Sequence, residues 1–379
     1  MAATLALVST DTNPTRLPGI LDAGEEAVRA WLAAQGEPPM RLRQICHGLL
    51  VRGAESFEQM SDLPRSLRAK LAEAYAPLAS RIVRHQHAAD DTHKLLLELY
   101  DGKQVECVLI REDGRRTACI STQVGCGMAC VFCASGLDGV ERNLTAGEIL
   151  EQLVRLRNLP EARSQRSEVR SQKSEVSRLS HIVVMGMGEP LANLDSLLEA
   201  LEVATSPDGL GIGARHITIS TVGLPAKIRR LAEAGKQYHL AVSLHAPNDA
   251  LRRQIVPTTD KVGLQAILEA ADAFHAATGR QVTYEYVLLA GINDEVRHAR
   301  DLARLLRGRK AHVNVIPFND VEGLPYHRPT TEALTAFCDA LRQGGLSVKV
   351  RKRKGSEIDA ACGQLRRNVL RASFEVTPT

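Results

Sequence analysis

Apolar positions repeat with two different periods along this chain. In the N-terminal part they recur every three to four residues, as on one face of an amphipathic helix, at 25–35, 41–53 and 61–75. Ser61 or Asp62 is the expected N-cap of the third helix. Residues 93–110 then hold two apolar runs around Asp101 and Gly102, a pair typical of a tight turn. The pattern therefore predicts three helices followed by a β-hairpin.

From residue 117 onward, short apolar runs alternate with helical patterns. Strands are predicted at 117–122, 181–187, 216–222, 239–245, 281–289 and 312–318. Helices are predicted at 144–157, 194–204, 224–234, 263–277, 294–307 and 331–342. Such alternation indicates an α/β fold with a parallel sheet joined by right-handed crossovers. Six units favour a partial (βα)6 barrel, while periodicity alone leaves an open doubly wound sheet as the alternative.

These patterns divide the chain into four expected parts. Residues 1–90 form a helical accessory domain, 91–116 a connecting β-hairpin, 117–345 the (βα)6 core, and 346–379 a basic C-terminal segment. The helix expected from 144 has Thr145 as its N-cap and Glu148 three residues later, which is the spacing of a capping box.

A tandem repeat interrupts the core. Residues 163–169 read RSQRSEV and residues 170–176 read RSQKSEV. The repeat lacks the paired apolar positions of a coiled coil, and its Ser, Gln, Glu and basic residues favour a mobile, solvated insertion over 161–178. The alternative is a basic arm that touches RNA.

Composition limits the class of protein. A chain of 379 residues with 44% hydrophobic content can bury a large core. We expect a cytoplasmic protein, because there is no signal peptide and no apolar run of about 20 residues that could span a membrane. The eight cysteines are then reduced thiols. We also expect the protein to be a monomer. The net charge of +4 identifies no partner, but the stretch from Arg342 to Arg371 is strongly basic.

Three cysteines stand together in the run CGMACVFC. Cys126, Cys130 and Cys133 have the spacing C-x3-C-x2-C, and no fourth cysteine follows in this loop. A structural zinc ion or a [4Fe–4S] cluster normally takes four protein ligands, so three thiolates leave one cluster iron open. With Phe132 before the third cysteine, the segment resembles the radical S-adenosylmethionine (SAM) enzymes, in which SAM fills that vacancy. A zinc site or a purely structural loop is the alternative.

Polar residues follow several predicted strands at the edge where barrel active sites gather. The second strand ends in MGMGEP, where Gly188 lets a ligand approach the backbone and Glu189 can accept hydrogen bonds from the amino group of SAM. Five further residues at this edge together outline a polar pocket: Ser220, Ser243, Leu244, His245 and Asn319. For each of them taken alone, the alternative is a role in a turn or a helix cap.

The remaining cysteines differ in their surroundings. Cys46, Cys107 and Cys338 are interpreted as buried packing residues, the usual state of a free cysteine. Cys362 lies among small residues in IDAACGQL, directly after the basic run VKVRKRKG. Nearby cations favour the thiolate, so Cys362 is expected to be reactive.

Several motifs together resemble one family. The runs STQVGCGMACVFCASG, RNLTAGEI, MGMGEP, SLHA, IPFN and RKRKGSEIDAACGQL are similar to those of the RlmN/Cfr radical SAM RNA adenine methyltransferases, most closely the RlmN branch. The similarity covers nearly the whole chain. Ser135, where a threonine is commoner, and the tandem repeat depart from the family pattern.

The resemblance implies a mechanism with two SAM molecules. Cys126, Cys130 and Cys133 would hold a [4Fe–4S] cluster, and SAM would contact Gly188, Glu189, Ser220, Ser243, Leu244, His245 and Asn319. Cys362 would carry the methyl group, Cys119 would release the product by forming a disulfide with Cys362, and Glu106 would accept a proton.

The resemblance also implies the substrates. They would be an adenine of 23S rRNA, methylated at C2, and tRNA, with a flavodoxin or ferredoxin as electron donor. Methylation of C8 of the same adenine is the close alternative. A non-catalytic RNA-binding protein with a metal loop is the alternative from another class, and it leaves Cys119 and Cys362 without a purpose. With 3% aromatic residues, RNA affinity would depend largely on phosphate contacts.

Overall fold

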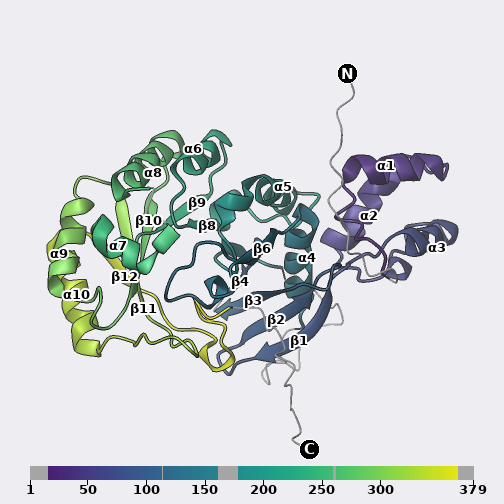
Figure 1. Ribbon diagram of the computed structural model, residues 1–379. Helices are drawn as coiled ribbons and strands as arrows, with labels where there is room; N and C mark the ends of the chain where they lie inside the picture. The colour runs from purple at the N-terminus through teal and green to yellow at the C-terminus, as the bar shows by residue number, and fades with distance from the viewer. Residues whose placement is uncertain (1–15, 113, 161–177, 259–261, 366–379) are drawn as a thin grey trace, which may run out of the picture.

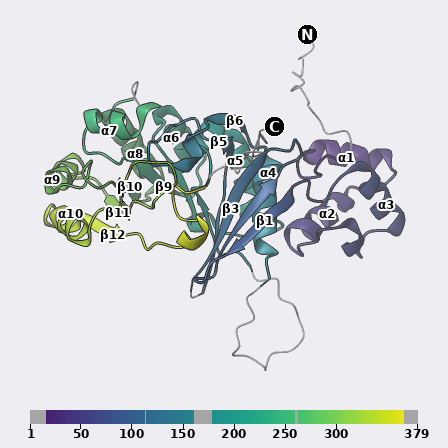
Figure 2. The same ribbon diagram turned by 60° about the horizontal axis from the view of Figure 1, so that its bottom comes forward.

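The N-terminal helices form a lobe beside the rest of the protein (Figures 1 and 2). The computed structural model describes residues 16–112, 114–160, 178–258 and 262–365, so the tandem repeat lies outside the described residues. The three predicted helices are confirmed as α1 (Glu25–Ala34), α2 (Met40–Leu50) and α3 (Arg65–Ala74), with a short 3-10 helix, η1, at Phe57–Gln59.

The predicted N-cap of α3 is wrong. The helix begins at Arg65, its N-cap is Pro64, and no side chain caps it. Pro64 favours this start because the fixed φ of proline suits the beginning of a helix. Asp62 instead forms an ion pair with Arg52, with 2.5 Å between Oδ1 and a guanidinium nitrogen.

A ten-stranded sheet forms the centre of the molecule, in the order β1-β2-β3-β4-β7-β8-β9-β10-β11-β12. Its antiparallel part contains β1 (Arg81–His87), β2 (Thr92–Glu98), β3 (Gln104–Glu112) and β4 (Arg115–Cys119). The pairing of β2 with β3 confirms the predicted hairpin. Sequence analysis missed β1, because this edge strand is almost entirely exposed and shows no apolar alternation.

The parallel part follows the chain without changing direction. From β4 it continues through β7 (His181–Val184), β8 (Ile217–Thr221), β9 (His239–Ser243), β10 (Val282–Leu288), β11 (Ala311–Pro317) and β12 (Ser347–Val350). A doubly wound sheet reverses its strand order at a switch point. This sheet does not, so the barrel-type interpretation is confirmed. The short β12, within the basic run, is one strand more than the six predicted.

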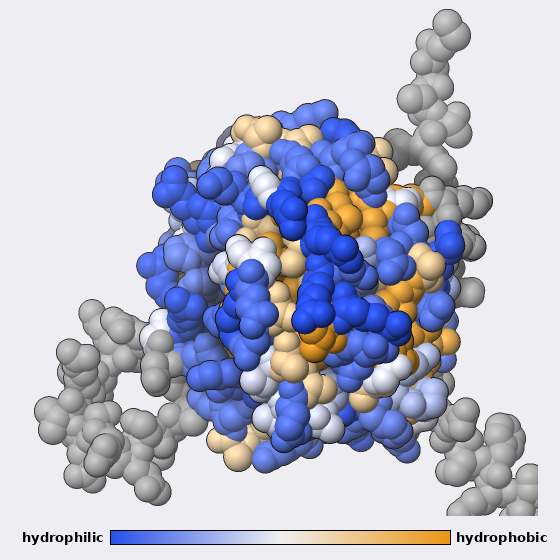
Figure 3. Space-filling model, turned by 90° about the vertical axis from the view of Figure 1, so that its left-hand side faces the viewer, coloured by the Kyte–Doolittle hydropathy of each residue, from blue (hydrophilic) through white to orange (hydrophobic). Residues whose placement is uncertain are grey.

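Helices connect the parallel strands. They are α4 (Ala146–Arg157), α5 (Leu194–Thr205), α6 (Pro225–Glu233), α7 (Asp249–Ile255), α8 (Leu264–Thr278), α9 (Val296–Leu305) and α10 (Thr331–Gln343). Short 3-10 helices lie at Ala134–Gly136, Pro190–Asn193, Ala214–His216 and Ser356–Ile358. Among the residues with assigned structure, no helix is long and apolar enough to cross a membrane. Figure 3 shows a largely hydrophilic surface over the α9 and α10 side.

Helix α4 holds the N-terminal lobe against the sheet. Its Val154 is buried in the apolar core of the lobe. Glu151 accepts hydrogen bonds of 2.7 Å from the backbone N–H groups of Ala79 and Ser80. Arg157 donates to the carbonyl oxygen of Leu49 at 2.8 Å. Because these buried polar groups are paired across the junction, the lobe has a defined position on the core.

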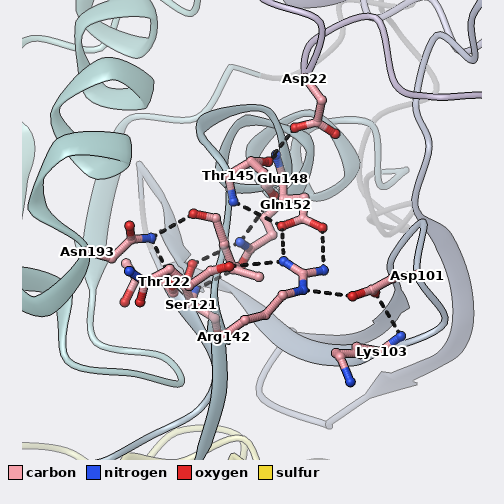
Figure 4. Close-up of polar contacts among 12 residues, drawn as sticks. Asp22, Asp101, Lys103, Ser121, Thr122, Arg142, Thr145, Glu148, Gln152 and Asn193 are labelled. Atoms are coloured by element: carbon pink, nitrogen blue, oxygen red, sulfur yellow. Dashed lines mark hydrogen bonds and ion pairs between the residues drawn. The ribbon is translucent and has the colours of Figure 1, made fainter. Parts of the chain in front are cut away.

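The start of α4 also joins the hairpin to the cysteine loop (Figure 4). The predicted capping box of Thr145 and Glu148 is confirmed. Arg142 donates two hydrogen bonds to the Glu148 carboxylate, at 2.7 and 2.8 Å, and a third to Asp101 in the turn between β2 and β3, at 2.7 Å. Arg142 lies in β6 (Val140–Asn143), which pairs with β5 (Gln123–Gly125) on either side of the cysteine loop. This network therefore fixes both ends of the loop.

Candidate functional site

The three predicted ligand cysteines lie in the loop between β5 and β6. Cys126, Cys130 and Cys133 line one cavity of about 140 Å³ at the carboxyl end of the parallel strands. The loop is fixed from within by the bond from the Cys133 N–H to the Cys130 carbonyl at 3.0 Å. It is fixed from α7 by the bond from the Val131 N–H to the Ile255 carbonyl, also 3.0 Å. The structure thus brings the three thiols together without a disulfide among them.

Burial makes these thiols poor acids on their own. It raises the pKa of Cys126 to about 12 and that of Cys130 well above its usual value, and it also raises the pKa of Cys133. Bound metal reverses this preference, because a coordinating thiol loses its proton. Three convergent thiols in a site that disfavours bare thiolates fit a cationic metal cluster.

The spread of the sulfur atoms bears on the zinc alternative. Four tetrahedral thiolates at about 2.3 Å from one zinc ion lie about 3.8 Å from one another. Among the described residues, one group of three possible ligand atoms lies within 4.8 Å of one another. That group is His87, Asp91 and His93, away from the cysteine loop. At least one pair of the three loop sulfur atoms is therefore more than 4.8 Å apart, wider than ligands to one zinc ion and compatible with ligands to separate iron atoms of one cluster.

Glu189 faces the same cavity from the end of β7. Its carboxylate accepts hydrogen bonds from the backbone N–H groups of Val222 at 2.9 Å and Leu191 at 3.0 Å. Burial raises the pKa of this carboxyl group, although these hydrogen bonds oppose the shift. A cationic ligand group in the cavity would favour its charged form. Gly188 has φ 103°, and a Cβ there would come within 2.7 Å of the Gln123 Cβ, so only glycine fits this approach.

Most of the predicted SAM contacts converge here. Ser220, Ser243 and His245 line the cavity together with Gly188 and Glu189. His245 has φ 61°, and its Nδ1 accepts a 3.1 Å hydrogen bond from the Val287 N–H. Burial lowers the pKa of His245 to about 3, with the charge of Arg252 as the second cause, so the ring is neutral at physiological pH.

Two predicted contacts lie elsewhere. The side chain of Leu244 is buried in the main apolar core and does not line this cavity. Asn319 lines a second cavity and donates from Nδ2 to the Cys362 carbonyl at 3.2 Å. Any contact from Leu244 to a ligand would therefore have to come from its backbone, and Asn319 acts here on the Cys362 segment.

Cys362 lines both cavities. Its segment is bonded to the cysteine loop: the Ala134 N–H donates to the Gly363 carbonyl at 2.7 Å, and the Ser135 Oγ donates to the Leu365 carbonyl at 2.5 Å. The second cavity, of about 490 Å³, is rich in basic side chains. They come from β4, from β12 and the segment after it, and from the loop before α10: Arg115, Arg328, Lys349, Arg351, Lys352, Arg353 and Lys354.

The other two predicted catalytic residues lie beneath these cavities. Cys119 is buried at the end of β4, and burial raises the pKa of its thiol to about 12, with Cys362 as the next cause. Glu106 is buried on β3 and forms an ion pair with Lys94 at 3.0 Å. Neither residue lines the two cavities. The structure thus brings Cys119 near Cys362, but it does not place Glu106 at the cavity surface.

Sequence reasoning missed three charged residues here. Arg252, from α7, is buried and donates to the carbonyl oxygens of Ser243 and Leu244 at 3.1 and 3.2 Å. Arg351 and Glu285 line both cavities, and the pKa of Arg351 is raised, first by Cys362 and then, against the effect of burial, by Glu285. A polar residue inside an apolar strand pattern, such as Glu285 in β10, is the sequence signal that could have identified such a site residue.

The cysteines predicted to act only in packing fit that role. Cys107 and Cys338 are buried, and Cys46 is partly buried against the core of the N-terminal lobe.

Comparison with known proteins agrees with this geometry. Residues 120–303 match the model of the radical SAM superfamily, and residues 19–76 match that of the ribosomal RNA large subunit methyltransferase N-terminal domain. A solved radical SAM methyltransferase from Sphaerobacter thermophilus is 40% identical, with a TM-score of 0.84, covering 92% of this chain and 99% of that one. The fold and site therefore define a radical SAM methyltransferase.

Curated relatives give the particular family. A probable dual-specificity RNA methyltransferase RlmN of Rhodopirellula baltica is 52% identical, over 96% of this chain and 95% of the relative. Another, from Geobacillus kaustophilus, is 41% identical over 94% of both chains. The chain belongs to the RlmN family of radical SAM RNA methyltransferases. Membership of this superfamily implies SAM and an iron–sulfur cluster as cofactors.

Proposed function

We propose that this enzyme methylates C2 of a specific adenine in 23S rRNA and in tRNA, using two SAM molecules and an S-methylcysteine at Cys362. The observation that carries the proposal is the position of Cys362, which lines both the cavity of the cysteine loop and the basic cavity. A thiol in this position can receive a methyl group on one side and present it to a base on the other.

The residues of the first cavity would bind the cofactors. Cys126, Cys130 and Cys133 would hold a [4Fe–4S] cluster, leaving one iron for SAM. When bound, the cluster and SAM supply the methyl group and the radical that activates it, as adenine C2 requires because its C–H bond resists polar methylation. Glu189 is suited to the SAM amino group, since its buried carboxylate faces the cavity and lacks a cationic partner among its hydrogen-bond donors.

Two thiols would share the work on the base. Cys362 would carry the methyl carbon to C2 as a methylene group. The Cys119 thiolate would then attack the Cys362 sulfur, so that the carbon–sulfur bond breaks, the carbon keeps the electron pair and takes a proton to become the methyl group of the RNA, and the two cysteines are left as a disulfide. Both are free thiols in the structure. Cys119 must lose its proton to attack, and the guanidinium of Arg351 opposes the burial that raises its pKa. Glu106 stays the predicted proton acceptor, with Lys94 holding its carboxylate.

The second cavity is suited to RNA. Its basic side chains can bind phosphate groups, while the target base leaves its stack to reach Cys362. A flavodoxin or ferredoxin would supply electrons. Because 23S rRNA and tRNA are cytoplasmic, the enzyme would act in the cytoplasm, and it would do so as a monomer. Residues 1–90, 91–116, 117–345 and 346–379 would then act as RNA-binding lobe, connecting hairpin, catalytic core and methyl-carrier segment.

Mass spectrometry of RNA tests the proposal. The chain would be expressed in a bacterial strain that lacks its own adenine C2 methyltransferase, with Cys362→Ser as the matched inactive control. We expect 2-methyladenosine in 23S rRNA and tRNA with the wild-type chain and none with the variant. Appearance of 8-methyladenosine alone would establish the alternative position, and the absence of both would overturn the proposal.

A further inference from the structure

A cluster of histidines stands on the hairpin of β1 and β2, away from both cavities. His87 and His93 are directly paired across the two strands, and their rings stack with centroids 4.2 Å apart. Asp91, in the turn, has φ 59°, a conformation that aspartate tolerates better than most residues. Opposed positions on paired strands carry side chains on the same face of the sheet, so the turn gathers these three residues at one point.

The three ligand atoms have the spacing of a metal site. The Asp91 Oδ1 lies 3.2 Å from the His87 Nε2 and 3.1 Å from the His93 Nε2. All three atoms lie within 4.8 Å of one another. Zinc binds histidine nitrogen and carboxylate oxygen at 2.0–2.2 Å in a tetrahedron, whose ligand atoms are then about 3.4 Å apart. The two contacts to Asp91 approach this spacing before any ion is bound, and the two histidine nitrogens lie within 4.8 Å of each other. The planes of the two rings differ by 6°, so one ring must turn for both lone pairs to point at the same ion.

A neighbouring histidine can support the metal-binding form of His93. The His85 Nε2 lies 3.0 Å from the His93 Nδ1. Without an ion, the His93 Nε2–H donates to Asp91; when an ion takes the place of that proton, the His93 Nδ1–H can donate to His85, the arrangement found around many histidine ligands.

One cation opposes metal binding. Arg111 lies 3.2 Å from the same Asp91 oxygen. It also donates to the Pro160 carbonyl at 2.7 Å, a contact it can keep when an ion replaces it at Asp91. The charge of Arg111 lowers the affinity for a divalent ion, but it does not block the open side of the cluster, where His87 and Asp91 are 48% and 39% exposed.

We propose that His87, Asp91 and His93 form a binding site for a zinc ion, with water in the fourth position. The site borders the segment that leads to Cys362. In the same turn, Asp90 accepts a 3.0 Å hydrogen bond from the Gly355 N–H, and the Ala89 N–H donates to Glu357 at 3.3 Å. An ion that closes the turn would therefore brace residues 355–357. The site does not depend on the reaction assigned to the enzyme.

Calorimetric titration of the cluster-loaded enzyme with zinc chloride tests this site, because the loop cysteines are then occupied. His87→Ala is the test variant, since His87 is exposed on an edge strand and its loss leaves the fold intact. His216→Ala is the matched control, because the His216 ring also contacts a second histidine, His181 of β7, at 3.1 Å.

We expect one zinc per wild-type chain, an affinity at least about tenfold lower for His87→Ala, and no change for His216→Ala. X-ray absorption at the zinc edge should show nitrogen and oxygen ligands without sulfur. If His87→Ala and Asp91→Asn both bind zinc like the wild type, the proposed site is wrong.

Discussion

The two cavities that meet at Cys362 are built from opposite chemistry. The smaller one, of about 140 Å³, brings together the three loop thiols, the Cys362 thiol and the buried carboxyl groups of Glu189 and Glu285, with Arg351 as the cation among its described lining residues. The larger one, of about 490 Å³, is lined by basic side chains from four places in the chain. Burial in the first favours neutral groups until a cationic ligand arrives, whereas the second offers positive charge to solvent. Cofactor chemistry and RNA recognition can therefore be disrupted separately.

The largest effect is expected from the cysteine loop. Replacing Cys130 by alanine should abolish iron binding and methylation. The wild-type cluster has three protein ligands, one fewer than usual, and two thiols are too few to hold it. Iron and sulfide analysis of anaerobically reconstituted protein measures this, with about four of each expected in the wild type. Cys46→Ala, in the N-terminal lobe, is the matched control and should keep both. Stoichiometric zinc in place of iron in the wild type would contradict the assignment.

A different result is expected at the boundary of the two cavities. Cys362→Ala should keep the cluster but form no RNA adduct, since the methyl carrier is missing. Cys119→Ala should still form the bond between carrier and base, and it should accumulate protein joined covalently to RNA because the resolving thiol is gone. A shifted band in denaturing gels, seen in cells that supply substrate RNA, measures the adduct. Normal turnover by Cys119→Ala would exclude the two-thiol mechanism.

Sequence pattern predicted the parts of this fold in which burial is strong. Buried strands such as β8 and amphipathic helices such as α4 are clear because one face of each is apolar. The strands β1 and β12 were missed because their residues are mostly exposed or polar, so pairing with a neighbouring strand and not burial defines them.

The candidate site divides in a similar way. The loop cysteines and Glu189 lie in short sequence motifs. The residue types and spacing within such a motif indicate its chemistry without knowledge of the fold. Arg252 and Lys94 reach the site region through side chains from separate elements, α7 and β2, and their ion pairs and hydrogen bonds join residues distant in sequence. Such contacts depend on tertiary packing, which a single sequence does not encode in its periodicity.

A moderate effect is expected in the basic cavity. Lys352→Ala should weaken RNA binding several-fold, and it should reduce the slope of log affinity against log salt by about 0.7–0.9, the contribution of one lost phosphate contact. Its iron content should be unchanged, because Lys352 lines only the larger cavity. Filter binding at several salt concentrations measures the slope, with the exposed Lys236→Ala as control. Equal slopes for both variants would show that the basic cavity does not contribute to RNA binding.

The smallest effect is expected where the cysteine loop holds the Cys362 segment. The Ser135 Oγ donates to the Leu365 carbonyl at 2.5 Å, and both groups are buried. Ser135→Ala removes this donor, which costs about 1 kcal/mol, or about a fivefold change in an equilibrium. If the bond keeps Cys362 in place, single-turnover methylation should slow by about that factor while RNA affinity stays the same. Ser135→Thr keeps the hydroxyl group and should restore the rate. A slow threonine variant with a normal alanine variant would show that side-chain size, and not the hydrogen bond, matters at this position.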